Sequence, residues 1–574
     1  MKKLLRYMGA YKLESVLGPL FKLLEATFEL IVPLVVASII DVGIEQQNRP
    51  HIWKMCLILV ALAMIGLICS ITAQFFAAKA SVGFATKLRH ILFAHVQTLS
   101  HADMDRLGAP TLIARMTNDI NQVQSGVNLA LRLLLRSPFV VFGAMIMAFT
   151  VDVRSAWTFA VIIPILCVVV FGIMLISIPL YRRVQASLDR VLGITRENLV
   201  GVRVLRAFGK QKSETEEFDS RNEHLTAVQK HVGRITALMN PVTFLLINLA
   251  VIALIYTGAL QVQSGVLTQG EVVALYSYMS QILVELIKMA SLIISMTKAA
   301  ACGSRVQKVL EVKPSQTFST TPVTPVDGAD AITFSHVGLT YEGAGEASLH
   351  DISFSAAPGE TVGIIGGTGA GKSSLISLIP RFYDATEGEI RIAGVPVNDY
   401  PAEQLRTAIG IVPQKAVLFR GTVRDNMRWG KRDATDEEIR RALEISQAAE
   451  FIDGLEAGLD HVIEQGGRNL SGGQRQRLTV ARALVANPDI LILDDSASAL
   501  DYATDLKLRR AIAAMDPAPT TVIVSQRAAS IRHADRILVL DDGELVAQGT
   551  HDELLTSCEV YREIYYSQFP KEEA

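Results

Sequence analysis

The sequence has few cysteines. Its 574 residues include five cysteines, and no two of them have CxxC spacing. We interpret them as small apolar side chains, because isolated, odd-numbered cysteines fit neither a metal-ligand set nor a disulfide framework. The formal net charge is only −2, which gives no reason to expect nucleic-acid binding. The cysteines are Cys56, Cys69, Cys167, Cys302 and Cys558.

We also expect no cleavable signal peptide at the N-terminus. The N-terminus, Met1–Tyr11, is basic and short, and no small-residue cleavage pattern follows the first apolar run. The chain is too long for one compact domain. Hydrophobic residues make up 50% of it. The long apolar runs fill the first half, whereas the second half is typical of a globular domain.

Six apolar runs dominate the first half. Each is close to the ~20 residues that a helix needs to cross a bilayer. Prolines in or beside the runs fit this interpretation, because membrane helices tolerate proline. The sequence therefore predicts six transmembrane helices, at about Val16–Ile40, Met55–Ala78, Leu133–Val151, Trp157–Leu180, Val242–Leu260 and Val272–Met296.

The connections between these runs differ in length and charge. The second and fourth, Lys79–Leu131 and Tyr181–Pro241, are long and polar, and the fourth is rich in arginine and lysine. The short loop Gln261–Glu271 has neither. Since basic loops stay in the cytoplasm, we expect the long connections, both termini and the C-terminal half to be cytoplasmic. Apolar spacing in Phe84–Leu99 and Leu188–Phe208 predicts that the spans continue as helices into the cytoplasm.

Two carboxylates in the first run need an explanation. Glu25 and Glu29 are four residues apart, so they share one face of a helix. A charge at this depth costs about 2.5–3.5 kcal/mol on insertion scales unless it is wet or paired. Two interpretations stay open: the pair lines the translocation cavity, or it is neutralised by basic side chains such as Arg132 and Arg136.

A composition change marks the border between the halves. Residues 312–330 are rich in Pro, Ser, Thr and Val without periodicity, as is typical of a linker. Strand-like and helical segments alternate after it, which predicts an α/β domain. We expect a six-helix transmembrane domain with two long intracellular loops at 1–311, a linker at 312–330 and an α/β domain at 331–569.

The strongest motif is a glycine-rich phosphate-binding loop. It follows the apolar run Thr361–Ile365 and precedes a helical pattern, which is the strand–loop–helix context that such a loop requires. Backbone N–H groups of the glycines can wrap phosphates at a helix N-terminus. Lys372 can reach the β- and γ-phosphates, and Ser373 can ligate Mg²⁺. The predicted ATP-binding residues here are Gly366, Gly367, Thr368, Gly369, Ala370, Gly371, Lys372, Ser373 and Ser374.

A second nucleotide motif lies downstream. The apolar run Ile490–Leu493 ends in Asp494, which fits a carboxylate that holds Mg²⁺. Together the two motifs predict binding of ATP with Mg²⁺.

Two further segments carry a resemblance to a known family. The segment Leu470–Gln474, with Ser471, Gly472, Gly473 and Gln474, and the segment Ser498–Asp501, with Asp501, are similar to the signature and the D-loop of ATP-binding-cassette (ABC) exporters of the multidrug-resistance type, built as half-transporters. The likeness covers the whole chain, including the six-helix arrangement. It implies an α-helical six-span domain followed by a P-loop α/β domain, with long intracellular helices swapped between two halves. It also implies that Tyr341 stacks on adenine and that Gln414 ligates Mg²⁺.

Two catalytic positions depart from the family pattern. The family expects a glutamate after the Mg²⁺ aspartate, and the chain has Asp495; it expects a switch histidine, and the chain has Gln526. Aspartate keeps the charge but is one methylene shorter, and a misplacement of ~1 Å can cost ~10²-fold in rate. Glutamine can hydrogen-bond a phosphate but does not exchange a proton near neutral pH. We expect this site to bind ATP and to hydrolyse it poorly.

The intact signature suggests a different role for this chain. In ABC dimers each nucleotide lies between the phosphate loop of one subunit and the signature of the other. The chain therefore resembles the degenerate-site subunit of heterodimeric bacterial multidrug exporters, with a partner half-transporter that supplies Glu and His. The implied cargo is hydrophobic or amphipathic and drug-like, exported across the bacterial cell membrane. The alternatives are a slow homodimeric ATP-gated channel or regulator, and a lipid or peptide exporter.

Overall fold

The computed structural model describes residues 2–569 and divides the chain into two compact units. The helical unit contains the chain up to residue 97 together with residues 110–312. The sheet unit contains residues 98–109 together with the chain from residue 313 onward. A short piece of the second connection thus packs with the C-terminal half rather than with the helices that flank it in sequence.

The helical unit contains six helices that are long and apolar enough to cross a membrane, counted over the described residues. All six predicted runs lie within them. They occupy Lys3–Ile44, Arg49–Val96, Ala109–Val151, Val153–Val200, Gln211–Gln263 and Gln269–Leu310. The α-helices of the first 312 residues are α1 (Lys2–Leu5), α2 (Lys12–Ser38), α3 (Arg49–Val96), α4 (His101–Leu107), α5 (Ala109–Ala114), α6 (Ile120–Leu133), α7 (Arg136–Val151), α8 (Val153–Val200), α9 (Val202–Ala207), α10 (Gln211–Ala237), α11 (Met239–Gln263) and α12 (Gln269–Leu310).

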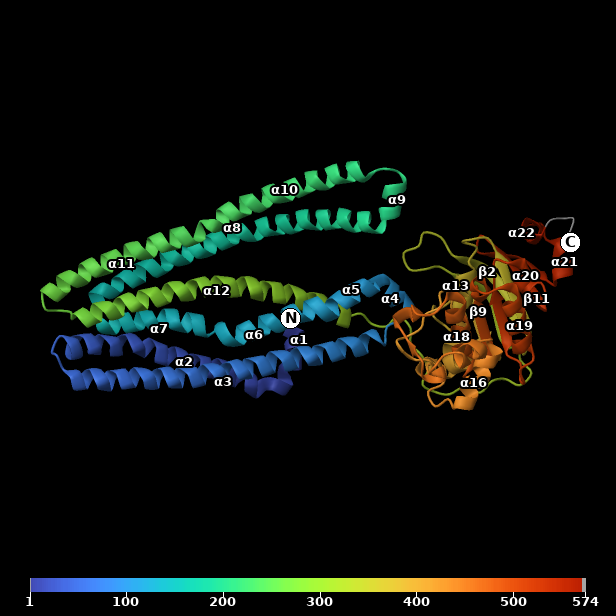
Figure 1. The fold of residues 1–574 in the computed structure, drawn as a ribbon, viewed down its shortest axis with the longest axis horizontal. Helices are drawn as coiled ribbons and strands as arrows, with labels where there is room; N and C mark the ends of the chain where they lie inside the picture. Colours follow the sequence, from blue (N-terminus) through green and yellow to red (C-terminus); the bar gives the residue numbers. More distant parts are fainter. Residues whose placement is uncertain (1, 570–574) are drawn as a thin grey trace. The chain divides into compact units, whose positions relative to one another are not determined.

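The longest of these helices exceed the thickness of a bilayer. Helices α3 and α8 each have 48 residues, or roughly 70 Å at 1.5 Å per residue, against a hydrocarbon core of about 30 Å. The predicted helical extensions are therefore present, and α10 continues in line with α11 (Figure 1). Within the unit α2 packs on α3, and α12 packs on α6 and α7.

Small residues allow the close approach of these helices. A Cβ on Gly270 of α12 would lie 2.4 Å from the carbonyl oxygen of Ala37. Asp41 fixes the same end, since its carboxylate accepts from the Gly270 N–H at 2.7 Å and from the Thr268 hydroxyl at 2.6 Å. Such small-residue contacts are the usual source of packing between membrane helices, which lack a hydrophobic driving force inside lipid.

The sheet unit contains two larger sheets and a third of two strands, β7 and β8. A six-stranded sheet has the order β12-β11-β3-β10-β9-β6, and a four-stranded antiparallel sheet has the order β2-β1-β4-β5. The strands are β1 (Ile332–Leu339), β2 (Leu349–Ala356), β3 (Thr361–Gly366), β4 (Glu387–Ile392), β5 (Val395–Pro396), β6 (Ile409–Val412), β7 (Gly421–Thr422), β8 (Val462–Ile463), β9 (Ile490–Asp494), β10 (Thr520–Val524), β11 (Arg536–Asp541) and β12 (Glu544–Gly549).

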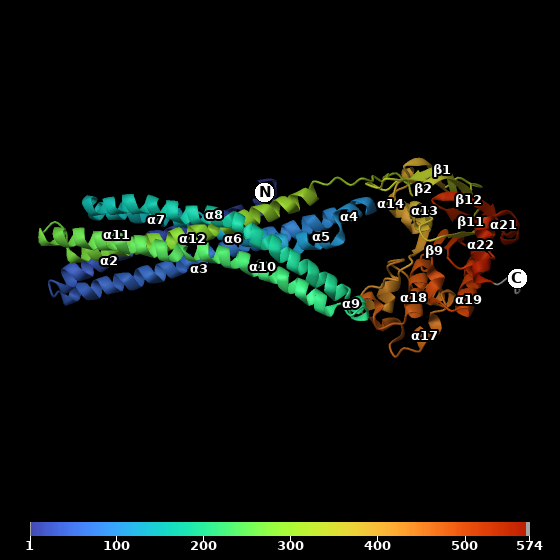
Figure 2. The same cartoon turned by 90° about the horizontal axis from the view of Figure 1, so that it is seen from above.

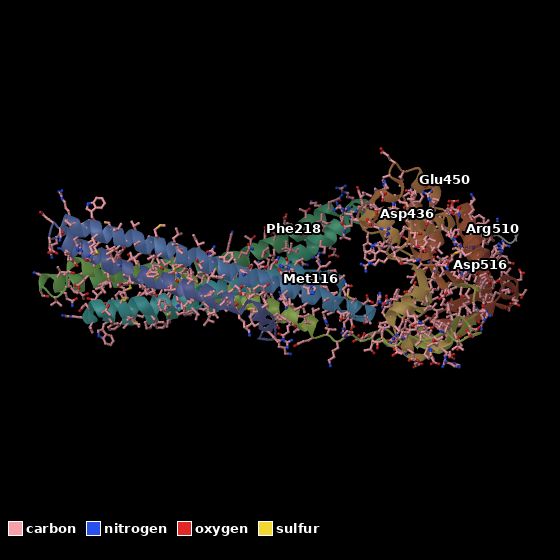
Figure 3. All side chains as sticks on the ribbon, turned by 90° about the horizontal axis from the view of Figure 1, so that it is seen from below. Met116, Phe218, Asp436, Glu450, Arg510 and Asp516 are labelled. Atoms are coloured by element: carbon pink, nitrogen blue, oxygen red, sulfur yellow. The ribbon has the colours of Figure 1, made fainter. Side chains whose placement is uncertain are left out.

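The larger sheet lies between the antiparallel sheet and a group of helices. In Figure 2, β1 and β2 lie at one side of this unit, α17 and α18 lie at the other, and β9 lies between them. Figure 3 places Asp436 and Glu450 in the part that holds α16 and α17. The helices are α13 (Lys372–Leu378), α14 (Ala402–Ala408), α15 (Val423–Met427), α16 (Asp436–Ile445), α17 (Ala449–Asp453), α18 (Gly472–Leu484), α19 (Tyr502–Ala513), α20 (Ala528–Ile531), α21 (His551–Ser557) and α22 (Glu559–Gln568).

The central strands separate two hydrophobic cores. Along β9, Ile490 and Ile492 face the core shared with the antiparallel sheet, whereas Leu491 and Leu493 face the core shared with α16 and α18. Burial on both faces explains why these strands appear in the sequence as continuous apolar runs. Strands β3, β10 and β9 are parallel neighbours. Their carboxyl ends therefore meet at one edge, where the phosphate loop, Asp494 and Gln526 lie.

The segment predicted as a linker is held against the sheet unit. Residues 313–331 form neither helix nor strand. Gln404 binds this segment at both backbone groups of Val323, at 3.1 and 2.6 Å. Phe318 lies between the guanidinium groups of Arg381 and Arg406, at 4.6 and 5.3 Å from its ring centre. Residues 313–331 are therefore bound to the sheet unit, and we call this segment the strap.

Candidate nucleotide-binding site

The phosphate-binding loop joins β3 to α13. Gly369 and Gly371 have φ values of 90° and 89°. Residues other than glycine rarely adopt this backbone conformation. A Cβ on Gly366 would lie 2.2 Å from the Leu540 carbonyl oxygen, whereas one on Gly367 or Gly369 would meet nothing within 4 Å. The loop thus packs tightly beneath and is open above. The Lys372 ammonium donates to the carbonyls of Gly366 and Gly367 at 2.9 and 2.5 Å, so it lies against the loop.

A pocket of about 490 Å³ lies at this edge of the sheet. It collects most of the residues that the sequence predicted for ATP binding and catalysis. Residues that the sequence analysis missed also line it, among them Ser348 and Asp542. Gly366, Gly367 and Ala370 form the loop but do not line the pocket. The predicted residues lining it are Thr368, Gly369, Gly371, Lys372, Ser373, Ser374, Gln414, Asp494, Asp495 and Gln526.

The charged groups of the pocket are arranged for a charged ligand. Burial, together with the neighbouring carboxylate of Asp495, raises the pKa of Asp494 above its usual range. Burial lowers the pKa of Lys372, and the two aspartates partly oppose that shift. Half-buried opposite charges that face one pocket are what a ligand bearing phosphates and a cation would neutralise.

The donor set fits Mg²⁺ held together with phosphate. Ser373, Gln414 and Asp494 offer a hydroxyl, an amide and a carboxylate, and Mg²⁺ takes oxygen ligands. Among residues 2–569 no group of three or more His, Cys, Asp or Glu side chains could hold a metal by itself. One carboxylate with phosphate oxygens is the pattern of a nucleotide-bound Mg²⁺ rather than of a protein cage.

Asp495, the first departing position, has a constrained backbone. Its φ is 44°, a left-handed conformation that aspartate adopts more readily than most residues. Its N–H donates to the Val524 carbonyl at 2.9 Å, and the Gln414 amide approaches its carboxylate at 3.4 Å. The side chain therefore starts from a fixed point, and its reach into the pocket is set by its length.

Gln526, the second departing position, is held by the C-terminal helix. The Gln568 side chain of α22 donates to the Gln526 carbonyl at 2.8 Å and accepts from the Ala528 N–H at 2.9 Å. The Gln568 amide therefore holds the backbone of residues 526–528 in place. The sequence analysis did not single out Gln568, because nothing near it in sequence indicates which loop it meets.

The signature residues form the start of α18. Ser471 caps the helix: its hydroxyl accepts from the Gln474 N–H at 3.3 Å, and the Gln474 side chain accepts from the Ser471 N–H at 2.9 Å. A Cβ on Gly472 would meet nothing within 4 Å. Gly473 approaches the D-loop, since a Cβ there would lie 3.1 Å from the Ala499 carbonyl oxygen. None of the four signature residues lines this chain's own pocket.

The remaining predicted positions are Asp501 and Tyr341. Asp501 caps α19 by accepting from the Thr504 N–H at 3.0 Å, and the side chain of Ser498 lies outside the described residues. The Tyr341 hydroxyl donates to Ser374 at 3.0 Å. Tyr341 lines a second pocket of 640 Å³ next to the phosphate loop.

In the helical unit, the two membrane carboxylates are paired with bases. Glu25 accepts from Lys22 at 2.5 Å, and Glu29 accepts from Arg136 at 2.6 Å. Arg136 also donates to Glu285 of α12 at 2.5 Å. This matches the pairing interpretation for Arg136, although the partner of Glu25 is Lys22 rather than Arg132. Glu285, which the sequence analysis missed, is the more deeply buried carboxylate.

Removing Glu285 should therefore destabilise the helical unit more than removing Glu29. The Glu285 side chain is 4% exposed and accepts from Arg136, Ser137 and Lys288, whereas Glu29 is 42% exposed. Glu285→Gln should cost about 1–3 kcal/mol, because it leaves a buried guanidinium poorly paired. Thermal unfolding of the detergent-solubilised protein measures this, with Glu29→Gln as the matched control. Equal losses in the two variants would contradict the assignment.

The comparisons with known proteins agree with this geometry. Residues 15–286 match the family model of the ABC transporter transmembrane region, and residues 349–498 match the family model described as ABC transporter. An uncharacterised ABC transporter ATP-binding protein of Bacillus subtilis, YfiB, is 37% identical over 572 residues, covering 100% of this chain and 99% of that protein. The chain belongs to the ABC transporters: it is an exporter-type half-transporter that binds ATP and couples its hydrolysis to transport.

Other relatives differ in what they are named for. The ATP-dependent lipid A-core flippase of Haemophilus ducreyi is 30% identical, over 99% of this chain and 98% of that protein. A probable multidrug resistance ABC transporter of Bacillus subtilis, YheI, is 35% identical, over 84% of this chain and 82% of that protein. A solved bacterial Atm1-family ABC exporter with ATP bound matches with a TM-score of 0.80 at 23% identity, covering 99% of this chain and 100% of that one. This last likeness supports the exporter fold alone.

Proposed function

We propose that this chain is the degenerate-site subunit of a heterodimeric ABC exporter. Its own pocket binds Mg-ATP and turns it over slowly, and its signature completes a competent site on a partner half-transporter. The observation that carries the proposal is the pair Asp495 and Gln526, which line one pocket together with Lys372, Ser373 and Asp494.

Both side chains are unsuited to their positions. The backbone of Asp495 is tied to Val524, so the carboxylate falls about one methylene short of where a glutamate would end. General-base catalysis needs the base within hydrogen-bond reach of the attacking water. Gln526 can donate to a phosphate oxygen but has no pKa near neutrality, so it binds without exchanging a proton.

The binding half of the site does not depend on these two positions. Lys372 and the loop N–H groups hold the phosphates, and Tyr341 stacks on the adenine. When bound through Ser373, Gln414 and Asp494, Mg²⁺ neutralises charge on the phosphate oxygens. Because binding is intact and hydrolysis is slow, this pocket retains ATP rather than hydrolysing it in every cycle.

The signature gives the chain a role at a second nucleotide. Ser471 and Gly472 are exposed at the start of α18 and do not reach this chain's own pocket. In the dimer they face ATP on the partner, whose Glu and His carry out the hydrolysis. The heterodimer is favoured over a homodimer because an intact signature has no use against a second slow site.

The cargo we propose is hydrophobic or amphipathic. A relative named as a lipid A-core flippase and one named for multidrug resistance support this class, and they align with 99% and 84% of this chain. The paired charges around Arg136 give the helical unit polar groups at membrane depth, which a purely apolar path would not need.

We place the protein in a bacterial cell membrane with both termini in the cytoplasm.

The pure chain should hydrolyse ATP slowly. If both composite sites of a self-assembled dimer use Asp495 and Gln526, turnover should be about 10²-fold below that of the complex with a half-transporter that carries Glu and His. The measurement is ATPase activity in lipid nanodiscs, with Lys372→Ala as the background. Turnover of the pure chain that equals that of the complex would overturn the heterodimer proposal.

A further inference from the structure

Both covalent connections from the spans into the sheet unit converge on one short run, Arg381–Asp384. The first connection is α4, whose His101 ring stacks on Phe382 with centroids 4.4 Å apart. The second is the strap that follows α12. Its Phe318 packs under the Arg381 guanidinium at 4.6 Å, and its Gln316 donates to Asp384 at 3.1 Å.

Tyr383, the remaining member of this run, connects α4 with Tyr341. Its hydroxyl donates to the Asp105 carboxylate of α4 at 2.5 Å. Its ring meets the ring of Tyr341 edge to face, with centroids 5.0 Å apart and planes at 89°. The Tyr341 hydroxyl donates in turn to Ser374 at 3.0 Å, at the start of α13. An unbroken path of contacts thus leads from α4 to the phosphate-binding helix.

These contacts determine how Tyr341 is oriented. The edge of Tyr383 and the hydroxyl bond to Ser374 hold the Tyr341 ring at two points, which fixes the plane that it offers to a base. Asp105 and Arg106 of α4 line the same 640 Å³ pocket as the two tyrosines. One wall of this pocket is therefore contributed by α4, the helix that follows α3 in sequence.

The hydrogen bond between Tyr383 and Asp105 persists at neutral pH. Burial, and then the bond to the Asp105 carboxylate, raise the pKa of Tyr383 well above its usual range. The phenol stays protonated, so it keeps donating. Because the acceptor is a carboxylate oxygen, the bond belongs to the stronger class of side-chain hydrogen bonds.

We propose that Tyr383 is a positioning residue that makes adenine binding on Tyr341 depend on the placement of α4. The proposal rests on the proposed function in one respect, the stacking of adenine on Tyr341. When α4 is docked, Asp105 holds Tyr383 and Tyr383 holds Tyr341 in its stacking orientation. By reciprocity, bound ATP stabilises the docked state of α4. The nucleotide base thereby acts on the second and third spans without passing through the γ-phosphate.

The test separates the base from the phosphates. Binding of Mg-ATP and of Mg-tripolyphosphate to the full chain in nanodiscs is measured by calorimetry. Tyr383→Phe removes only the hydroxyl, and His101, Phe382 and the strap still hold α4. We expect Tyr383→Phe and Asp105→Asn each to weaken Mg-ATP binding about threefold to tenfold, with tripolyphosphate affinity unchanged. In a Tyr341→Ala background, Tyr383→Phe should have no further effect, because the two act as one unit.

Tyr400→Phe is the matched control, because it also removes a phenol hydrogen bond, to the Ile392 carbonyl at 2.8 Å, but one without a link to Tyr341. It should leave ATP affinity unchanged. The proposal fails if Tyr383→Phe behaves like this control, if ATP and tripolyphosphate weaken together, or if its effect adds to that of Tyr341→Ala. If Tyr341→Ala itself leaves ATP affinity unchanged, adenine does not stack on Tyr341, and the proposed positioning role of Tyr383 is wrong as well.

Discussion

Replacing Ser471 with arginine should abolish most ATP hydrolysis by the assembled complex, with a loss of at least about 100-fold. Ser471 is exposed at the start of α18, where the open space beside Gly472 leaves room for a phosphate. A serine hydroxyl and free N–H groups at a helix start stabilise phosphate charge, and loss of such donors costs about 10²–10³ in rate. An arginine side chain would also fill the space. ATPase activity of the co-purified complex measures the effect.

Thr435→Arg is the matched control for this change. Thr435 and Glu438 form the same capping box at the start of α16, and Thr435 is equally exposed. The control therefore loses a helix cap, about 1 kcal/mol, without touching a nucleotide. The nucleotide bound in this chain's own pocket should be retained in both variants. If the Ser471 variant keeps the activity of the Thr435 variant, the signature does not serve the competent site.

Most of the architecture could be predicted from the sequence because its signals are local. Six apolar runs near bilayer length give six helices, and glycines between a strand and a helix give a phosphate loop. Strands β3, β9 and β10 were visible because they are buried on both faces and so read as unbroken apolar runs. The strap was harder. Its composition indicates a linker, and its docking depends on Arg381 and Gln404, which lie far away in sequence.

The site was predictable in its parts but not in its supports. The motif residues around Lys372 and Asp494 have fixed spacing, so their types reveal them. Gln568, Tyr383 and Glu285 act through contacts with residues 42, 278 and 149 positions away, and no local pattern encodes such pairs. The pairing of Glu29 with Arg136 was one of two open interpretations, because charge alone does not reveal which side chains the helices bring together.

The backbone contacts of Asp495 and Gln526 indicate that hydrolysis at this site can be restored by substitution. Gln568 binds the backbone of Gln526 and Ala528 rather than a side chain, so a histidine at 526 would be presented from the same place. Asp495 is fixed through its own N–H, so a glutamate there would extend about one methylene further toward the water. Neither replacement requires the pocket to be rebuilt.

Asp495→Glu combined with Gln526→His should therefore restore hydrolysis at this site by about tenfold or more. Nucleotide trapping in the complex measures it: the unmodified site should retain ATP, and the double variant should accumulate ADP. Asp495→Glu alone should do little, because Gln526 still fails to position the γ-phosphate and the water. Because histidine titrates near pH 6.5, the restored activity should also fall as the pH drops through that value.

The unmodified protein supplies the decisive comparison. A site that holds ATP through many turnovers at the other site keeps the two ATP-binding domains in partial contact, so the cytoplasmic side need not open fully in each cycle. If ADP appears in the unmodified pocket at the rate of overall turnover, Asp495 and Gln526 are catalytic as they stand and the degenerate-site proposal is wrong. If the double variant binds ATP but still forms no ADP, the defect lies outside these two positions. Gln414 would then be the next residue to test, since its amide lies 3.4 Å from the Asp495 carboxylate.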